Sequence, residues 1–113
     1  NKIVKRNLII DNNVNKISGE DTIISLKNNN DRIIYHSRFH LVDGISYNFT
    51  NNKKSVILKT KLKNIWIFKS DIELVVEDSI YVDNNKTTPT KQIVIKGIVN
   101  TAKQTRKWSL EKQ

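Results

Sequence analysis

The fold is decided by residues 55–63, SVILKTKLK, in which apolar and polar side chains alternate. Successive side chains of a β-strand point to opposite faces of the sheet. The alternation therefore predicts a strand over residues 55–62. The face toward a core would carry Val56, Leu58, Thr60 and Leu62. The opposite face would carry Ile57 and the lysines Lys59, Lys61 and Lys63.

The same period of two recurs along the chain, and no stretch longer than about ten residues keeps the period of an α-helix. Strands are expected near residues 5–10, 16–18, 22–26, 32–42, 46–50, 55–62, 65–69, 73–82, 92–99 and 107–110. Asparagines at 12–13, 28–30, 51–52 and 84–85 supply turns, because Asn tolerates a positive φ. The pattern predicts an all-β fold, an antiparallel β-sandwich of about nine to ten short strands.

The length of 113 residues suits one domain with a modest core and is too short for two. We therefore expect a single domain over residues 1–113. The absence of cysteine excludes a disulfide framework, a thiol nucleophile and a cysteine metal site. No apolar run approaches the roughly 20 residues that span a bilayer, and no membrane partner is expected. The chain opens on Asn1 without a signal-type segment, so we expect a piece of a longer protein, either periplasmic or cytoplasmic.

Lysine and arginine total 20 against 11 acidic residues, a formal net charge of +9. Such an excess favours a polyanionic partner, which could be nucleic acid, anionic lipid or acidic polysaccharide. The stripe of Lys59, Lys61 and Lys63 could touch such a chain, although charged strand faces are more often simply solvated or protect a sheet edge. Nucleic-acid modules interleave aromatic residues with basic ones. Residues 55–63 contain no aromatic side chain, so a nucleic-acid partner is not expected.

Both histidines lie in the expected strand over residues 32–42, where His36, Arg38 and His40 share one face. Four residues along a strand span about 13 Å, whereas zinc lies about 2 Å from each ligand, so the two histidines cannot hold one metal ion. A single histidine is more often a hydrogen-bonded surface residue than a ligand.

Motifs of catalysis are absent: the chain has no Gly-rich phosphate loop, HExxH pair or nucleophile elbow. The acids Asp71, Glu73, Glu77 and Asp78 could include a general acid/base pair. Because they flank the apolar residues 74–76, they are more typical of solvating charges. No catalytic residue is assigned.

Seven segments resemble, in order, the C-terminal domain of bacterial heparinase II/III-like proteins, and together they cover nearly the whole chain. They are residues 6–11 (RNLIID), 17–21 (ISGED), 37–41 (SRFHL) with Gly44, 66–68 (WIF), 74–81 (LVVEDSIY), 90–97 (TKQIVIKG) and 107–110 (KWSL). Each segment alone is weakly specific, whereas the ordered set is fairly specific.

The resemblance implies a polysaccharide lyase in which an (α/α) toroid precedes a β-sandwich. Such enzymes cleave uronic-acid-containing chains by β-elimination, and the toroid supplies most catalytic residues. This chain would then be an accessory domain that packs on the toroid. It would have an anionic polysaccharide as partner, but no cofactor and no activity of its own. Two alternatives are a non-catalytic carbohydrate- or polyanion-binding module and a purely structural domain.

Some members of this family hold a structural zinc in the β domain through histidine and carboxylate ligands. The family motif often runs Arg-Phe-His-Leu-His-Pro-Gly, and here Val42 and Asp43 replace the second histidine and the proline. Val4 stands where the family often has another histidine. His40 keeps its place in the motif, so the resemblance implies His40 as a zinc ligand of the parent enzyme. It also implies Arg38 and His40 in substrate binding, to which we add Lys59, Lys61 and Lys63.

Overall fold

The computed structural model describes residues 2–25, 33–99 and 103–113. Every regular element in these ranges is a strand, and none of the described residues forms a helix that could cross a membrane. The strands are β1 (Lys2–Asp11), β2 (Lys16–Ser25), β3 (Ile33–His40), β4 (Ser46–Phe49), β5 (Ser55–Lys59), β6 (Ile65–Ser70), β7 (Leu74–Asp83), β8 (Lys86–Val99) and β9 (Lys103–Lys112). The predicted all-β class is confirmed.

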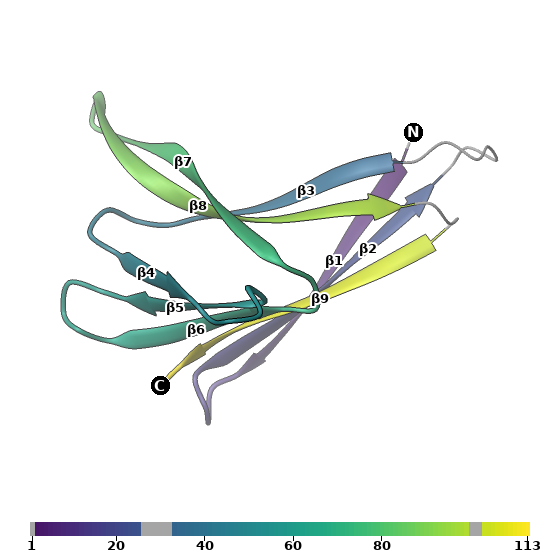
Figure 1. Ribbon diagram of the computed structural model, residues 1–113, viewed down its shortest axis with the longest axis horizontal. Coiled ribbons are helices and arrows are strands. Elements are labelled where there is room, and N and C mark those ends of the chain that lie inside the picture. The colour runs from purple at the N-terminus through teal and green to yellow at the C-terminus, as the bar shows by residue number, and fades with distance from the viewer. Residues whose placement is uncertain (1, 26–32, 100–102) are drawn as a thin grey trace.

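Two antiparallel sheets form the sandwich (Figure 1). Sheet A has six strands in the order β1-β2-β9-β6-β5-β4, and sheet B has three in the order β3-β8-β7. Sheet B lies across one side of sheet A, as Figure 1 shows. Because three strands cannot cover six, apolar side chains of the edge strand β1 such as Leu8 and Ile10 stay more than half exposed, at 54% and 64%.

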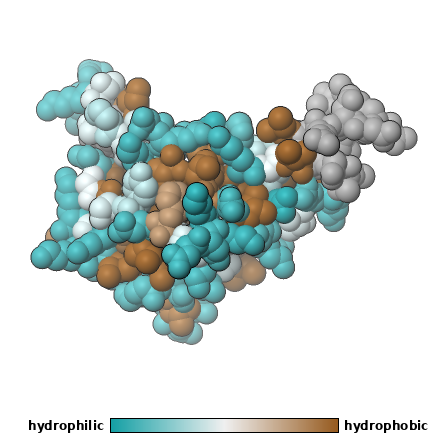
Figure 2. Space-filling view, in the orientation of Figure 1, coloured by the Kyte–Doolittle hydropathy of each residue, from teal (hydrophilic) through white to brown (hydrophobic). Residues whose placement is uncertain are grey.

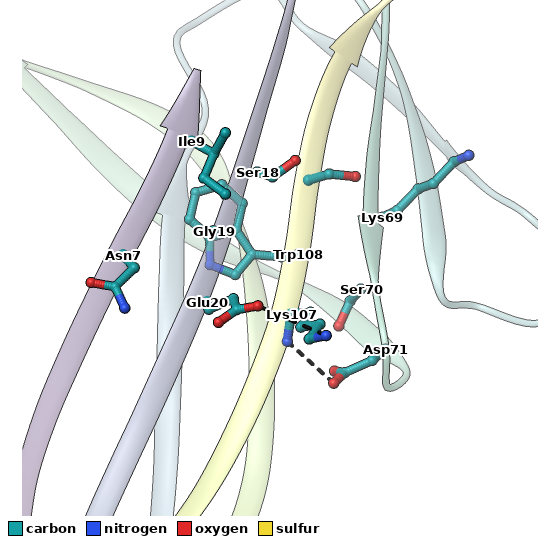
Figure 3. A pocket seen from close by; sticks show the side chains of 11 residues that line it. Asn7, Ile9, Ser18, Gly19, Glu20, Lys69, Ser70, Asp71, Lys107 and Trp108 are labelled. Atoms are coloured by element: carbon teal, nitrogen blue, oxygen red, sulfur yellow. Dashed lines mark hydrogen bonds and ion pairs between the residues drawn. The ribbon is translucent and has the colours of Figure 1, made fainter. Parts of the chain in front are cut away.

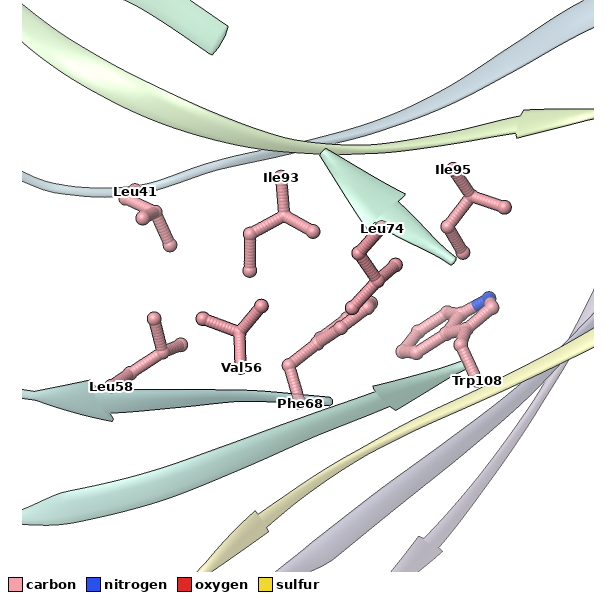
Figure 4. Close-up of a cluster of buried hydrophobic side chains, with 8 residues drawn as sticks. All are labelled: Leu41, Val56, Leu58, Phe68, Leu74, Ile93, Ile95 and Trp108. Atoms are coloured by element: carbon pink, nitrogen blue, oxygen red, sulfur yellow. The ribbon is translucent and has the colours of Figure 1, made fainter. Parts of the chain in front are cut away.

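The main core fills the space between the two sheets (Figure 4). Sheet A contributes Val56, Leu58, Phe68 and Trp108, while the opposite side contributes Leu41, Leu74, Ile93 and Ile95. Phe39 packs against this core, with its ring centroid 4.8 Å from that of Phe68 and 4.7 Å from that of Trp108. The inward positions predicted for Val56 and Leu58 are therefore confirmed. Full burial of such a side chain contributes roughly 1.5–3 kcal/mol.

A partly buried ion pair ties the sheets together beside the core. Arg6 of β1 donates two hydrogen bonds to Asp21 of β2, at 2.7 and 2.9 Å. Ser37 of sheet B donates to the same carboxylate at 3.0 Å. The Arg6 guanidinium also lies over the rings of Phe39 and Trp108, 5.1 and 5.3 Å from their centroids. Residues from four of the family-like segments thus meet at one junction between the sheets.

The prediction of a strand over residues 55–62 was wrong at its end, because β5 stops at Lys59. Residues 60–64 close a tight turn in which the Lys63 amide donates to the Thr60 carbonyl at 2.9 Å. Lys63 takes a φ of 64°, as in a three-residue hairpin loop with a left-handed last residue. Leu62, expected in the core, is 86% exposed at this turn.

The expected strands at 16–18 and 22–26 are one strand, β2, which continues through Gly19. A Cβ at Gly19 would lie 2.3 Å from the Trp108 indole, so this glycine makes room for a neighbouring side chain rather than ending a strand. The predicted ends at residues 26 and 32 lie outside the described residues. The expected turn at 84–85 is confirmed, since Asn84 and Asn85 have φ values of 47° and 65°.

Candidate functional site

The outer face of sheet B carries three of the side chains that the sequence singled out, those of His36, Arg38 and His40. All three lie on one face of β3, as predicted, and the structure places this face away from the core. Strand pairing places His40 opposite Gln92 of β8, and Gln92 lies opposite Glu77 of β7. This one register row therefore joins residues far apart in the sequence across all three strands.

A carboxylate shared by two cations forms the centre of this face. Arg38 donates from its guanidinium to one oxygen of Glu77 at 2.9 Å, and the ammonium of Lys96 lies 3.0 Å from the other oxygen. Hydrogen bonds from Lys96 and Arg38 lower the pKa of Glu77 below its ordinary value. Because one negative charge faces two positive charges, the cluster keeps a net positive charge at neutral pH.

His40 lies at one end of the same face. Its Nδ1 is 3.0 Å from the hydroxyl of Ser79 on β7. A hollow of about 210 Å³ opens beside this pair and is lined in part by Ser79, Thr90 and Lys91. His36 instead lies beside Arg38, with 3.4 Å between its Nδ1 and the guanidinium. The two histidines thus have different neighbours although they share one face.

The three lysines of residues 55–63 do not form a strand stripe, which corrects that prediction. Lys59 lies at the end of β5 on the outer face of sheet A, on the opposite side of the sandwich from Arg38 and His40. Lys61 and Lys63 lie in the turn that follows. The stem of Lys61 runs over Gly44, and its ammonium is 3.9 Å from the carboxylate of Asp43. The five predicted substrate-binding residues therefore do not make one site.

The zinc predicted for the parent enzyme finds no ligand set in the described part of the chain. A structural zinc takes four ligands, whereas the described residues contain no group of three His, Asp or Glu side chains that could hold a metal ion. The Nδ1 of His40 instead contacts the hydroxyl of Ser79. A zinc role for His40 stays a prediction that requires ligands from beyond the described residues.

Glu77, Ser79 and Lys96 belong to this face, yet the sequence did not single them out as site residues. Glu77 was interpreted as a solvating charge. Its contact with Arg38 joins residues that are 39 positions apart. Only the pairing order of β3, β8 and β7 brings these residues together, and no local pattern specifies that order.

Comparison with known protein families supports the resemblance that the sequence indicated. A family model described as heparinase II/III-like, C-terminal, matches residues 1–109. No curated protein and no solved structure gives a significant match. Since the match covers far more than half of the chain, this chain belongs to the heparinase II/III-like C-terminal domain family.

Proposed function

We propose that this chain is the accessory domain of a polysaccharide lyase, and that the outer face of sheet B contacts an anionic, uronic-acid-containing glycan. Membership of the heparinase II/III-like C-terminal domain family supports the role as an accessory domain. The observation that carries the proposal is the Arg38–Glu77–Lys96 cluster, in which two cations share one carboxylate on an exposed sheet face.

The chemistry of this face suits a uronate. A guanidinium presents donors in a planar fork that matches a carboxylate, and the side chain of Arg38 is 40% exposed. The side chain of Lys96 is 49% exposed, so both cations can bind a second anion without leaving Glu77. The imidazole of His40 and the hydroxyl of Ser79 add groups that can hydrogen-bond to sugar hydroxyls.

The proposed division of labour leaves bond cleavage to the parent enzyme. β-Elimination needs a proton acceptor and a neutralised uronate carboxylate held in one cleft. The sheet B face offers cations for the carboxylate, but the hollow beside His40 and Ser79, about 210 Å³ among the described residues, is smaller than most small-molecule sites. The contribution of the face is to concentrate the polyanion and to hold it near the preceding part of the parent, in which the toroid is expected.

The test compares affinities of two double variants for a hyaluronan oligosaccharide in low salt. Arg38→Ala combined with Lys96→Ala should weaken binding by about tenfold, equivalent to 1.4 kcal/mol. The control is Lys5→Ala combined with Lys112→Ala, which removes the same charge from exposed positions elsewhere. The control should change the affinity by no more than about threefold. Equal losses in the two double variants would show that only net charge matters and would overturn the proposal.

A non-catalytic glycan-binding module is the alternative function, and it would use the same face. The two functions differ in the parent enzyme. If the domain serves catalysis, His40→Ala should lower turnover in the full-length protein much more than His36→Ala, because only His40 keeps its place in the family motif. Equal and small effects on turnover would favour the binding module.

A further inference from the structure

A second hollow lies on the opposite side of the sandwich, on the outer face of sheet A. It has a volume of about 540 Å³ and is formed by β1, β2, β9, β6 and the first residue after β6 (Figure 3). This volume falls within the range of small-molecule sites, about 300–1,000 Å³. None of the five predicted substrate-binding residues lines it.

The strand register explains why this part of the sheet is hollow. Ser18 of β2 pairs with Ser109 of β9, so two small hydroxyl side chains stand next to each other in the middle of the sheet. On one side Ser18 pairs with Ile9, and on the other Ser109 pairs with Lys69. Two long side chains thus flank a floor of two serines. Ile9 is 68% exposed, which leaves an apolar wall open to a ligand.

The next row of outward-facing side chains, which includes Glu20 and Lys107, supplies polar groups whose charges balance. The ammonium of Lys107 lies 3.8 Å from the carboxylate of Glu20. The backbone amide of Lys107 donates to the carboxylate of Asp71 at 3.2 Å, which holds that acid at the rim (Figure 3). With Lys69, the hollow is lined by two ammonium groups and two carboxylates. In contrast to the Arg38–Glu77–Lys96 cluster on sheet B, these four groups carry no net charge.

We propose that this hollow binds a neutral pyranose unit. A sugar ring presents hydroxyls that both donate and accept, and C–H groups that pack on apolar surface. The floor of Ser18 and Ser109 offers both hydrogen-bonding roles, Glu20 and Asp71 accept, and Ile9 supplies the apolar contact. A densely anionic unit gains no net attraction there, because the two carboxylates offset the two ammonium groups. The inference goes beyond the proposed function, because it assigns a separate site and a different sugar chemistry to the same domain.

The experiment titrates the chain with N,N′-diacetylchitobiose and with cellobiose while amide shifts are followed by NMR. At least one of these sugars should shift amides of β2 and β9 around Ser18 and Ser109. Ser109→Leu, which fills the floor, should weaken this binding by about tenfold or more, equivalent to 1.4 kcal/mol. The matched control is Thr105→Leu, which lies on the same face of β9 outside the hollow and should leave the affinity unchanged.

Salt and the sheet B variants separate this inference from the proposed function. Binding of a neutral sugar should be the same at low and high salt, because charge screening does not act on it. It should also persist when Arg38 and Lys96 are both replaced by alanine. The inference is overturned if neither sugar binds, if Thr105→Leu weakens binding as much as Ser109→Leu does, or if the shifts appear on β3, β7 and β8 instead.

Discussion

Asp21 is only 1% exposed, and its carboxylate joins the two sheets through Arg6 and Ser37. Burial by itself raises the pKa of Asp21, but the hydrogen bonds and charge of Arg6, together with Ser37, outweigh it and lower the pKa. The Trp108 indole N–H adds a weaker stabilisation, although its geometry falls short of a formed hydrogen bond. The carboxylate is therefore ionised in the folded domain.

Asp21→Ala should lower the free energy of unfolding by about 2–4 kcal/mol at pH 7, because it leaves Arg6 and Ser37 without their acceptor. Because the pKa of Asp21 is lower in the folded than in the unfolded chain, its ionised carboxylate stabilises the fold at pH values above the unfolded pKa of about 3.9. This stabilisation is lost as the pH falls through the folded-state pKa. The difference from wild type in urea denaturation should thus shrink below about pH 4. The exposed Asp43→Ala is the control, expected within about 0.5 kcal/mol of wild type. Equal losses for Asp21 and Asp43 would refute this role.

Gly19 is the second residue with a testable structural role. Any Cβ there would meet the Trp108 indole at 2.3 Å, on the core side of β2. Gly19→Ala should therefore cost about 1–3 kcal/mol, the usual range for overpacking, and should alter the near-UV circular dichroism of Trp108. The neighbouring Ser18→Ala, whose side chain lies on the outer face, should leave both unchanged. If Gly19→Ala changed neither the stability nor the near-UV circular dichroism, the Trp108 indole would be free to move aside.

At the scale of elements, the β5–β6 turn contains a strained residue. Lys63 has a φ of 64°, a conformation that costs a non-glycine residue about 1–2 kcal/mol. Lys63→Gly should raise the free energy of unfolding by about 0.5–1 kcal/mol in thermal or urea denaturation. Lys61→Gly removes the same charge from the same turn at a residue without a positive φ, and it should not stabilise. If both variants change the free energy of unfolding equally, the loss of charge and not the backbone conformation of Lys63 causes the effect.

The strands themselves could be read from the sequence, because a period of two directly reports a half-buried sheet. Val56 and Leu58 were placed correctly for this reason. The end of β5 could not be predicted, since the alternation continues to residue 63 while the backbone turns after Lys59. The hydrogen bonds of that turn, at Thr60, Lys63 and Asn64, are not visible in the alternation. Gly19 misled in the opposite direction, because a glycine in a strand marks either a break or the close approach of another side chain.

Only the β3 residues of the candidate site could be predicted from the alternation of side chains. Alternation along β3 put Arg38 and His40 on one face, which the structure confirms. Their partners Glu77 and Ser79 come from β7. These side chains meet because β3 and β7 both pair with β8 in one sheet. Strand order depends on long-range packing and not on local pattern. The stripe expected for Lys59, Lys61 and Lys63 does not form because β5 ends at Lys59. A role of these lysines in substrate binding stays a prediction.

At the scale of the whole molecule, the chain should bind a uronate polymer without cleaving it. The sheet B face holds cations and two exposed histidines, and the proposal leaves bond cleavage to the parent enzyme. Incubation of the purified chain with heparan sulfate, alginate or hyaluronan should therefore produce no absorbance of unsaturated uronate. Appearance of that absorbance in the 113-residue chain would place the catalytic groups inside it and contradict the accessory role.

The role of the sheet B face can be tested by mapping amide shifts while the chain is titrated with a hyaluronan oligosaccharide in low salt. We predict shifts that cluster on the outer face of sheet B, around Arg38, His40 and Lys96, and that diminish as salt is added. Shifts confined to Lys59, Lys61 and Lys63, or the absence of any shift, would show that the outer face of sheet B is not the surface that contacts the anionic glycan.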